Sequence, residues 1–178
     1  IDFNYRNQII AGVKVTDVLT GSQFDIKSTV VVNAAGPWVD TLRDINNSKQ
    51  GKRLHLTKGV HLVVSHDKFP VKQAIYFDVA DGRMIFAIPR GRTTYIGTTD
   101  TNYEDSLDEV YTSKTDAVYL INAVNQTFPL VNLFLSDIES SWAGLRPLIH
   151  EDGKSASELS RKDEIFESSS GLISIAGG

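Results

Sequence analysis

Short apolar runs separated by turn residues recur along the chain, and this pattern predicts a protein built mainly from β-strands. Two such runs, residues 84–88 and 94–98, flank the turn signal Pro-Arg-Gly-Arg at residues 89–92. We expect a strand pair with both arginines of its tip in water, because proline and glycine favour turns. The second run leads into Gly-Thr-Thr-Asp at residues 97–100, which places several polar groups at one end of the sheet. Such strand ends often carry function, although a plain hairpin with a basic turn has the same pattern.

Further strands are expected on both sides of this pair. The strand pattern recurs in six more runs: 9–18, 23–26, 29–32, 54–64, 74–79 and 163–167. Residues 29–32 form a continuous apolar run, which is typical of a strand buried on both faces. Residues 137–149 predict an extended segment that Gly144 interrupts and Pro147 ends, and residues 171–178 predict a strand that runs into a glycine pair. The succession of strands and turns favours an antiparallel sheet.

A helical period governs residues 113–128. Ser113 suits the N-cap position, and Asp116 three residues later completes a capping box. Apolar residues then recur at helical spacing: Ala117, Ile121, Val124 and Phe128. Pro129 stops the pattern, since proline cannot continue a helix. We expect this helix to pack its apolar stripe against the sheet.

A strand, a turn of small residues and a helix start follow one another near residue 36. Ala34, Ala35 and Gly36 form the turn, and Pro37 suits the first position of a short helix. Backbone N–H groups at such a turn can face an anion or a cofactor, because a helix N-terminus attracts negative charge. Tight packing is the other interpretation of these small residues.

Composition and charge exclude several classes of protein. The 178 residues carry a net charge of −4, and their lysines and arginines are scattered, so we expect no nucleic-acid surface. The sequence has no cysteine, which excludes disulfides, thiolate metal sites and cysteine nucleophiles, and we expect no metal. No apolar run approaches the roughly 20 residues that cross a bilayer, and the first residues lack the plan of a secretory signal. We therefore expect a cytoplasmic protein.

Two polar side chains lie within apolar surroundings. His61 lies inside an apolar strand pattern, where it is either a hydrogen-bonded core histidine or a pocket residue with a pKa suited to proton transfer. Arg146 has apolar neighbours on both sides, so its charge needs a designated partner. A protein carboxylate such as Glu139 or Asp100 is one candidate. An anionic ligand is the other, since a guanidinium binds carboxylates and phosphates through parallel hydrogen bonds.

Five motifs follow one another along the chain: VVNAAGPW at 31–38, TKGVH at 57–61, IGTTD at 96–100, GLRPL at 144–148 and IAGG at 175–178. Together they resemble the FAD-dependent glycerol-3-phosphate dehydrogenases and the related α-glycerophosphate oxidases. Each motif alone is modest, but five in order are specific. The chain lacks the Gly-x-Gly-x-x-Gly of that family and the lysine and threonines that would follow Gly178. We therefore expect the middle of a longer enzyme, with no FAD of its own and little or no catalysis.

The resemblance implies an α+β fold divided between two tasks. Residues 51–167 would be the substrate-binding (cap) domain of a flavoprotein, a mostly antiparallel sheet with a helix packed on it. Residues 1–50 and 168–178 would be partial strands of the FAD-binding domain. The residues that the resemblance places near the dinucleotide are Ala34, Ala35, Gly36, Gly177 and Gly178.

The resemblance also implies roles for four side chains. His61 would accept the proton of the substrate hydroxyl, and Asp100 would be an acidic residue of the same catalytic pocket. Arg146, also catalytic, and Arg161 would hold the substrate phosphate. The reaction would oxidise sn-glycerol 3-phosphate to dihydroxyacetone phosphate with hydride transfer to FAD. The electron acceptor, the oligomeric state and peripheral attachment to the inner face of the cell membrane stay open.

Two other functions fit the same residues. A flavoprotein amino-acid or amine oxidase has a similar two-domain plan, and its carboxylate substrate would also bind an arginine. A non-catalytic, anion-binding α+β module would instead use Arg146 and Asp100 as a structural ion pair, with His61 in its core.

Overall fold

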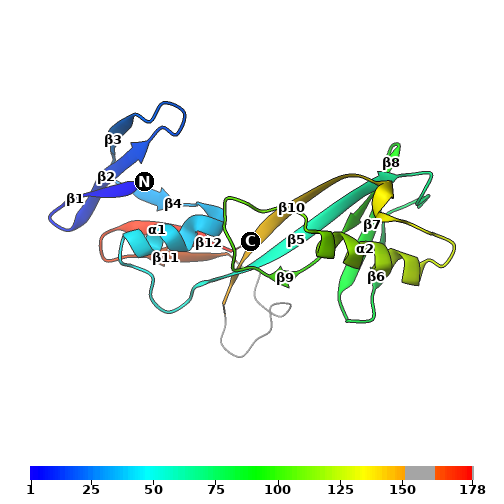
Figure 1. The fold of residues 1–178 in the computed structure, drawn as a ribbon. Helices are drawn as coiled ribbons and strands as arrows, with labels where there is room; N and C mark the ends of the chain where they lie inside the picture. Colours follow the sequence, from blue (N-terminus) through cyan, green and yellow to red (C-terminus); the bar gives the residue numbers. More distant parts are fainter. Residues whose placement is uncertain (151–162, 178) are drawn as a thin grey trace. The chain divides into compact units, whose positions relative to one another are not determined.

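The computed structural model describes residues 1–150 and 163–177 of the chain. Strands predominate over helices, and all but one of the paired strands with a described register are antiparallel. The predicted α+β class with a mostly antiparallel sheet is therefore confirmed (Figure 1).

The chain divides into two compact units. Unit 1 comprises Ile1–Leu56 with Pro147–Gly178, and unit 2 comprises Thr57–Arg146. The first boundary, after Leu56, lies a few residues beyond the domain limit predicted at residue 50. The second boundary, after Arg146, lies well before the limit predicted at residue 167. The assignment of the domains to cofactor and substrate stays a prediction.

A six-stranded sheet forms the framework of unit 2. Its order is β10-β5-β8-β7-β6, and β9 pairs with β5 off this path. The strands are β5 (Leu54–Ser65), β6 (Ile75–Asp78), β7 (Met84–Arg90), β8 (Thr93–Gly97), β9 (Thr101–Asn102) and β10 (Ile138–Ile149). The predicted hairpin is the pair β7–β8, and its turn is Gly91 with Arg92. Arg90 and Arg92 are exposed, as the sequence predicted.

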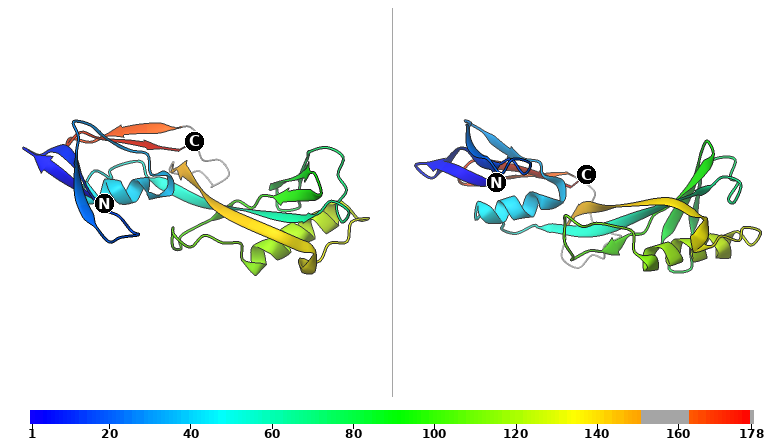
Figure 2. Two further views of the ribbon diagram at one scale, coloured as in Figure 1. Left: turned by 90° about the horizontal axis from the view of Figure 1, so that it is seen from above. Right: turned by 45° about the horizontal axis from the view of Figure 1, so that its top comes forward.

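Helix α2 (Lys114–Thr127) lies along one face of this sheet in each view (Figures 1 and 2). Ser113 caps it, because the Ser113 hydroxyl accepts a hydrogen bond from the Asp116 N–H and the Asp116 carboxylate accepts one from the Ser113 N–H. The helix ends before Pro129, so the predicted helix and both its signals are confirmed. Helix and sheet share one apolar core, whose fully buried members include Val60, Leu62, Val64, Ile85, Ala87, Ile96, Leu120 and Val124.

Unit 1 contains two three-stranded sheets. One is the antiparallel meander β1 (Asp2–Arg6), β2 (Ile9–Thr16) and β3 (Gln23–Lys27); the other has the order β11 (Glu164–Glu167), β12 (Leu172–Ala176) and β4 (Val31–Asn33). Strands β4 and β12 are parallel. After β4 come the 3₁₀ turn Gly36–Trp38 and helix α1 (Val39–Ile45). Figure 1 shows the meander in dark blue.

Two details of the strands differ from expectation. The run at residues 29–32 is not buried on both faces, because side chains alternate along β4: Val31 packs on a small core, while Val30 and Val32 are 56% and 52% exposed. Strand β10 continues through Gly144 and Pro147 instead of stopping there. It is the edge strand of its sheet, where a proline without an N–H is tolerated.

Candidate functional site

The two faces of the unit 2 sheet differ in chemistry. Along β5, Val60, Leu62 and Val64 point into the core under α2, so the His61 side chain between them points to the opposite face, to which Gly59 also belongs. The register continues this face across the sheet, because His61 pairs with Gly97 of β8 and Gly97 pairs with Phe86 of β7. The polar residues that the sequence singled out therefore lie on the face away from the helix.

A glycine and two aromatic rings form the surroundings of the His61 imidazole. A Cβ on Gly97 would lie 2.5 Å from His61 Cδ2, so only glycine leaves room for the ring in this position. The Trp142 indole stacks on the imidazole, with ring centroids 4.7 Å apart and an angle of 7° between the planes. Phe86 lies at a centroid distance of 5.4 Å on a tilted plane. His61 is thus held in a slot of defined orientation.

The electrostatics of His61 favour its neutral form. Burial lowers the pKa of His61 below its ordinary value, and the nearby positive charge of Arg146 lowers this pKa further. Nδ1 is buried and has no hydrogen-bond partner among the described residues. Because Nδ1 is buried, Nε2 is the nitrogen that a ligand can reach. A neutral imidazole can accept a proton there at neutral pH.

Arg146 lies against the backbone of β5 and binds the segment that follows β8. A Cβ on Gly59 would lie 2.6 Å from Arg146 Nη1, so this glycine makes room for the guanidinium. Nη1 donates to the Thr99 carbonyl and to Asp100 Oδ1, and Nη2 donates to Thr98 Oγ1, each over 3.3 Å. A guanidinium has five N–H groups. Within the described residues, the Nε–H and one Nη2–H have no acceptor, which leaves donors for an anion.

The segment 98–100 is itself anchored to β5 by one side chain. The ladder with β5 runs to the pair His61–Gly97 and resumes at Lys58–Thr101. In the gap between them, the buried Thr99 hydroxyl donates to the Lys58 carbonyl and accepts from the Val60 N–H, both over 3.1 Å. The hydroxyl thus replaces the missing ladder bonds and fixes the groups that face Arg146.

Lys58 forms an ion pair with helix α2 and is not one of the groups that bind Arg146. Its Nζ lies 2.7 Å from Asp116 Oδ2 of helix α2, with both side chains largely buried. Burial alone would raise the pKa of Asp116, but hydrogen bonds from Lys58 and Ser113 and the charge of Lys58 lower it below the ordinary value. This ion pair ties the first turn of α2 to β5.

The structure brings three of the predicted side chains together in unit 2. Arg146 and Asp100 form an ion pair at 3.3 Å, and His61 lies within range of the Arg146 charge. Glu139, the other candidate partner of Arg146, pairs with Arg92 instead. Arg161 lies outside the described residues. Sequence reasoning missed Trp142, whose only local signal is its even spacing from Arg146 along one face of β10.

The residues predicted to lie near the dinucleotide follow two adjacent parallel strands of unit 1. Ala34, Ala35 and Gly36 follow β4, and Gly177 follows β12, so both turns lie at the same edge of the sheet. Gly36 has φ +56°, and a Cβ there would meet no described heavy atom within 4 Å. Ligands of α/β sheets bind at this carboxyl edge, and small residues there fit the close approach of a dinucleotide. Gly178 lies outside the described residues.

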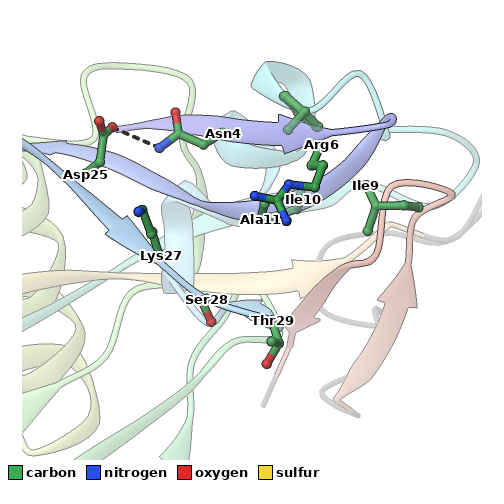
Figure 3. A pocket seen from close by; sticks show the side chains of 10 residues that line it. Asn4, Arg6, Ile9, Ile10, Ala11, Asp25, Lys27, Ser28 and Thr29 are labelled. Carbon is green, nitrogen blue, oxygen red and sulfur yellow. Dashed lines mark hydrogen bonds between the residues drawn. The ribbon is translucent and has the colours of Figure 1, made fainter.

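A wide hollow of about 890 Å³ lies over the meander of unit 1 (Figure 3). Arg6 and Lys27 line it, and Asn4 donates a hydrogen bond to Asp25 over 2.8 Å at its rim. None of the predicted site residues lines this hollow. Within residues 1–150 and 163–177, no three His, Asp or Glu side chains are grouped as metal ligands, and no helix is long and apolar enough to cross a membrane.

Comparisons with known proteins agree on one family. A model described as DAO, FAD dependent oxidoreductase, matches residues 5–177. The aerobic glycerol-3-phosphate dehydrogenase of Bacillus subtilis is 55% identical over 174 residues, which cover 98% of this chain and 31% of the relative. The X-ray structure of the glycerol-3-phosphate dehydrogenase from Bacillus halodurans complexed with FAD has a TM-score of 0.90 at 53% identity, covering 100% of this chain and 34% of that one. The glycine oxidase of Bacillus cereus has a TM-score of 0.62 at 22% identity, over 99% of this chain and 43% of that one. The chain spans about a third of the length of the curated relatives it matches.

Proposed function

Because the chain belongs to the FAD dependent oxidoreductase family, we propose that the whole protein oxidises sn-glycerol 3-phosphate to dihydroxyacetone phosphate. The family match and the similar proteins confirm the resemblance to the FAD-dependent glycerol-3-phosphate dehydrogenases that the five motifs indicated. One observation supports the substrate more than any other: a guanidinium with N–H donors left for an anion lies on the same sheet face as a histidine kept neutral. An anion clamp beside a proton acceptor suits a phosphorylated alcohol.

Arg146 would bind the substrate phosphate. Its contacts with Asp100, Thr98 and the Thr99 carbonyl fix the plane of the guanidinium, so that the remaining N–H groups point in one direction. Asp100 would thus act by orienting Arg146. A second cation is expected for a phosphate dianion, and we propose Arg161 for this role on the resemblance alone.

His61 would accept the proton of the C2 hydroxyl at Nε2. Breaking this O–H bond leaves electrons to form the C2 carbonyl, while the C2 hydrogen leaves with its bonding pair as hydride. FAD, when bound, supplies the acceptor for that hydride. We propose that Ala34, Ala35, Gly36, Gly177 and Gly178 lie along the dinucleotide, which is supported by the small residues at the shared edge of β4 and β12.

The experiment that tests this function is rapid-mixing reduction of the flavin of the whole protein by glycerol 3-phosphate. Replacing Arg146→Met should weaken substrate binding at least 30-fold, since breaking a charge-assisted pair costs about 2–5 kcal/mol. Arg92→Met is the matched control, because Arg92 is an exposed arginine of the same unit that pairs with Glu139. Equal affinity in Arg146→Met and Arg92→Met would exclude Arg146 as the phosphate ligand.

The same assay addresses the other two functions. The likeness to glycine oxidase lies under 25% identity and supports the fold alone, so we expect no reduction by amino acids. A non-catalytic module would show no reduction by any substrate, and Arg146→Met would then lower only the stability. We further propose a cytoplasmic protein with at most peripheral contact to the inner face of the membrane, in keeping with a sequence free of cysteine.

A further inference from the structure

The orientation of His61 has an unusual physical basis. Histidines that act on protons usually have the ring orientation fixed by a hydrogen bond from the second nitrogen to a carboxylate or carbonyl. In the described part of the chain, Nδ1 of His61 has no such partner. Gly97, opposite His61 in the ladder, has no side chain to restrain the ring. The outer torsion of a histidine is broad, so the backbone alone does not fix the plane.

Aromatic contacts fix the orientation of the imidazole instead. The Trp142 indole covers one face of the imidazole almost in parallel, at 4.7 Å and 7°. Tyr95 holds Trp142 in turn, edge to face, with centroids 5.2 Å apart and an angle of 79°. Both rings belong to the sheet, Tyr95 to β8 and Trp142 to β10, so the stack has a rigid support. Trp142 is 43% exposed, more than core packing alone would leave it.

We propose that Trp142 is a positioning residue, whose indole sets the plane of the His61 imidazole so that Nε2 faces the bound substrate. The inference rests on the proposed function for its catalytic consequence, but the stack itself is independent of any substrate. The charge that acts on His61 is that of Arg146 on β10, which pairs with Asp100 after β8. Nδ1 has no hydrogen-bond partner among the described residues, so the contacts with the parallel Trp142 ring and the tilted Phe86 ring remain to orient the imidazole.

The kinetic test separates rate from affinity in the whole protein. Trp142→Leu should lower the limiting rate of flavin reduction by glycerol 3-phosphate about 10- to 100-fold, because small misplacements of a catalytic group are costly. The dissociation constant of the substrate should change less than about threefold, since Arg146 is untouched. Trp142→Phe, which keeps a stacking ring, should recover most of the rate. An unchanged rate in Trp142→Leu, or a Phe variant as slow as the Leu variant, would overturn the proposal.

A spectroscopic test needs no substrate. The sequence contains two tryptophans, Trp38 and Trp142, and 5-fluorotryptophan labels both for ¹⁹F NMR. The Trp142 resonance, identified by its loss in Trp142→Phe, should titrate with His61 and stop titrating in His61→Gln. If it titrates while no substrate reduces the flavin, the proposed function fails and the stack stands. If the Trp142 resonance titrates in the same way in His61→Gln as in the unchanged protein, this result alone overturns the inference.

Discussion

The two units of the chain bury different kinds of side chain. Unit 2 has a single apolar core of thirteen buried residues between α2 and its sheet. In the part of unit 1 that the structure describes, there are two buried clusters of three residues each, and the buried side chains include Asn33, Arg43, Asn46 and Ser174. Arg43 donates to Asp40 and to two backbone carbonyls, and its guanidinium lies 4.1 Å over the Phe166 ring.

The main source of stability that the structure shows is the core of unit 2. Burial of apolar surface is the main driving force of folding, so unit 2 is stabilised chiefly by one continuous core. Among the described residues of this chain, which spans about a third of the length of its relatives, unit 1 adds hydrogen bonds around Arg43, and Ile165 and Ile175 are 67% and 40% exposed. The candidate catalytic residues of unit 2 therefore lie on a sheet that one continuous apolar core supports, as precise placement requires.

The largest effect is expected from shortening matched core leucines. Leu120→Ala in unit 2 should cost about 3–4 kcal/mol, because many close-packed neighbours surround the cavity and cannot all move into it. Leu172→Ala in unit 1 should cost about 2 kcal/mol, since a cluster of three residues collapses more easily. Urea unfolding followed by the fluorescence of Trp142 for unit 2 and of Trp38 for unit 1 measures both. A larger loss for Leu172→Ala would contradict the ranking of the two cores.

The next largest loss of stability should come from breaking a buried ion pair, compared with an exposed one. Lys58→Met leaves the Asp116 carboxylate buried without its cation and should cost about 3 kcal/mol. Lys49→Met in unit 1 removes the surface pair with Asp44, whose side chains are 35% and 55% exposed, and should cost under about 1 kcal/mol. Urea midpoints give both values. Adding Asp116→Asn to Lys58→Met removes the buried charge but keeps an oxygen that can accept from the Ser113 N–H, so part of the stability should return. A double variant as weak as the single one would argue against this mechanism.

Acid should weaken unit 2 through the same carboxylate. The pKa of Asp116 is lower in the folded state than in the unfolded one, so the unfolded state binds the proton more readily. The stabilisation is complete above the ordinary carboxyl pKa of 3.8 and is lost as pH falls through the lower folded value. Asp116→Asn should therefore have a flatter stability profile below pH 4 than the unchanged protein. The surface variant Asp44→Asn is the control, and parallel profiles of the Asp116 variant and the parent would refute the effect.

Local signals explain most of what the sequence predicted about the fold. Helix α2 has its cap, its apolar stripe and its stop between Ser113 and Pro129, and the β7–β8 hairpin has its turn at Gly91. Strand β1 was missed, because Asp2–Arg6 mixes polar and apolar residues and its turn uses Asn7 and Gln8 in left-handed conformations. The burial of residues 29–32 was wrong, because neighbours distant in sequence decide it.

The residues of the candidate site could be singled out from the sequence, but their contacts could not. Motifs identify His61, Asp100 and Arg146, yet the choice between Asp100 and Glu139 depends on the pairing of β10 with β5, from which the Arg146 side chain reaches the segment after β8. The same non-local placement brings Trp142 onto His61. No local pattern encodes which strands become neighbours, since that depends on the packing of the whole sheet.

The smallest change in stability is expected from Gly59→Ala, which should nevertheless weaken substrate binding. Gly59→Ala places a methyl group where the Arg146 guanidinium lies, but the atoms it meets are the far end of a flexible side chain that can swing away. The free energy of unfolding should therefore change by less than about 1 kcal/mol. Displacing the guanidinium from its three acceptors should weaken glycerol 3-phosphate binding about tenfold or more.

Gly144→Ala is the matched control, because a Cβ there meets nothing within 4 Å, two residues from Arg146 on the same strand. Urea unfolding and substrate titration of the flavin reduction, measured side by side on both variants, separate fold from site. If Gly59→Ala lost stability in proportion to affinity, the guanidinium would belong to the framework of unit 2. If only affinity falls, the core under α2 holds the sheet in place while the opposite face of the sheet is left to bind the substrate.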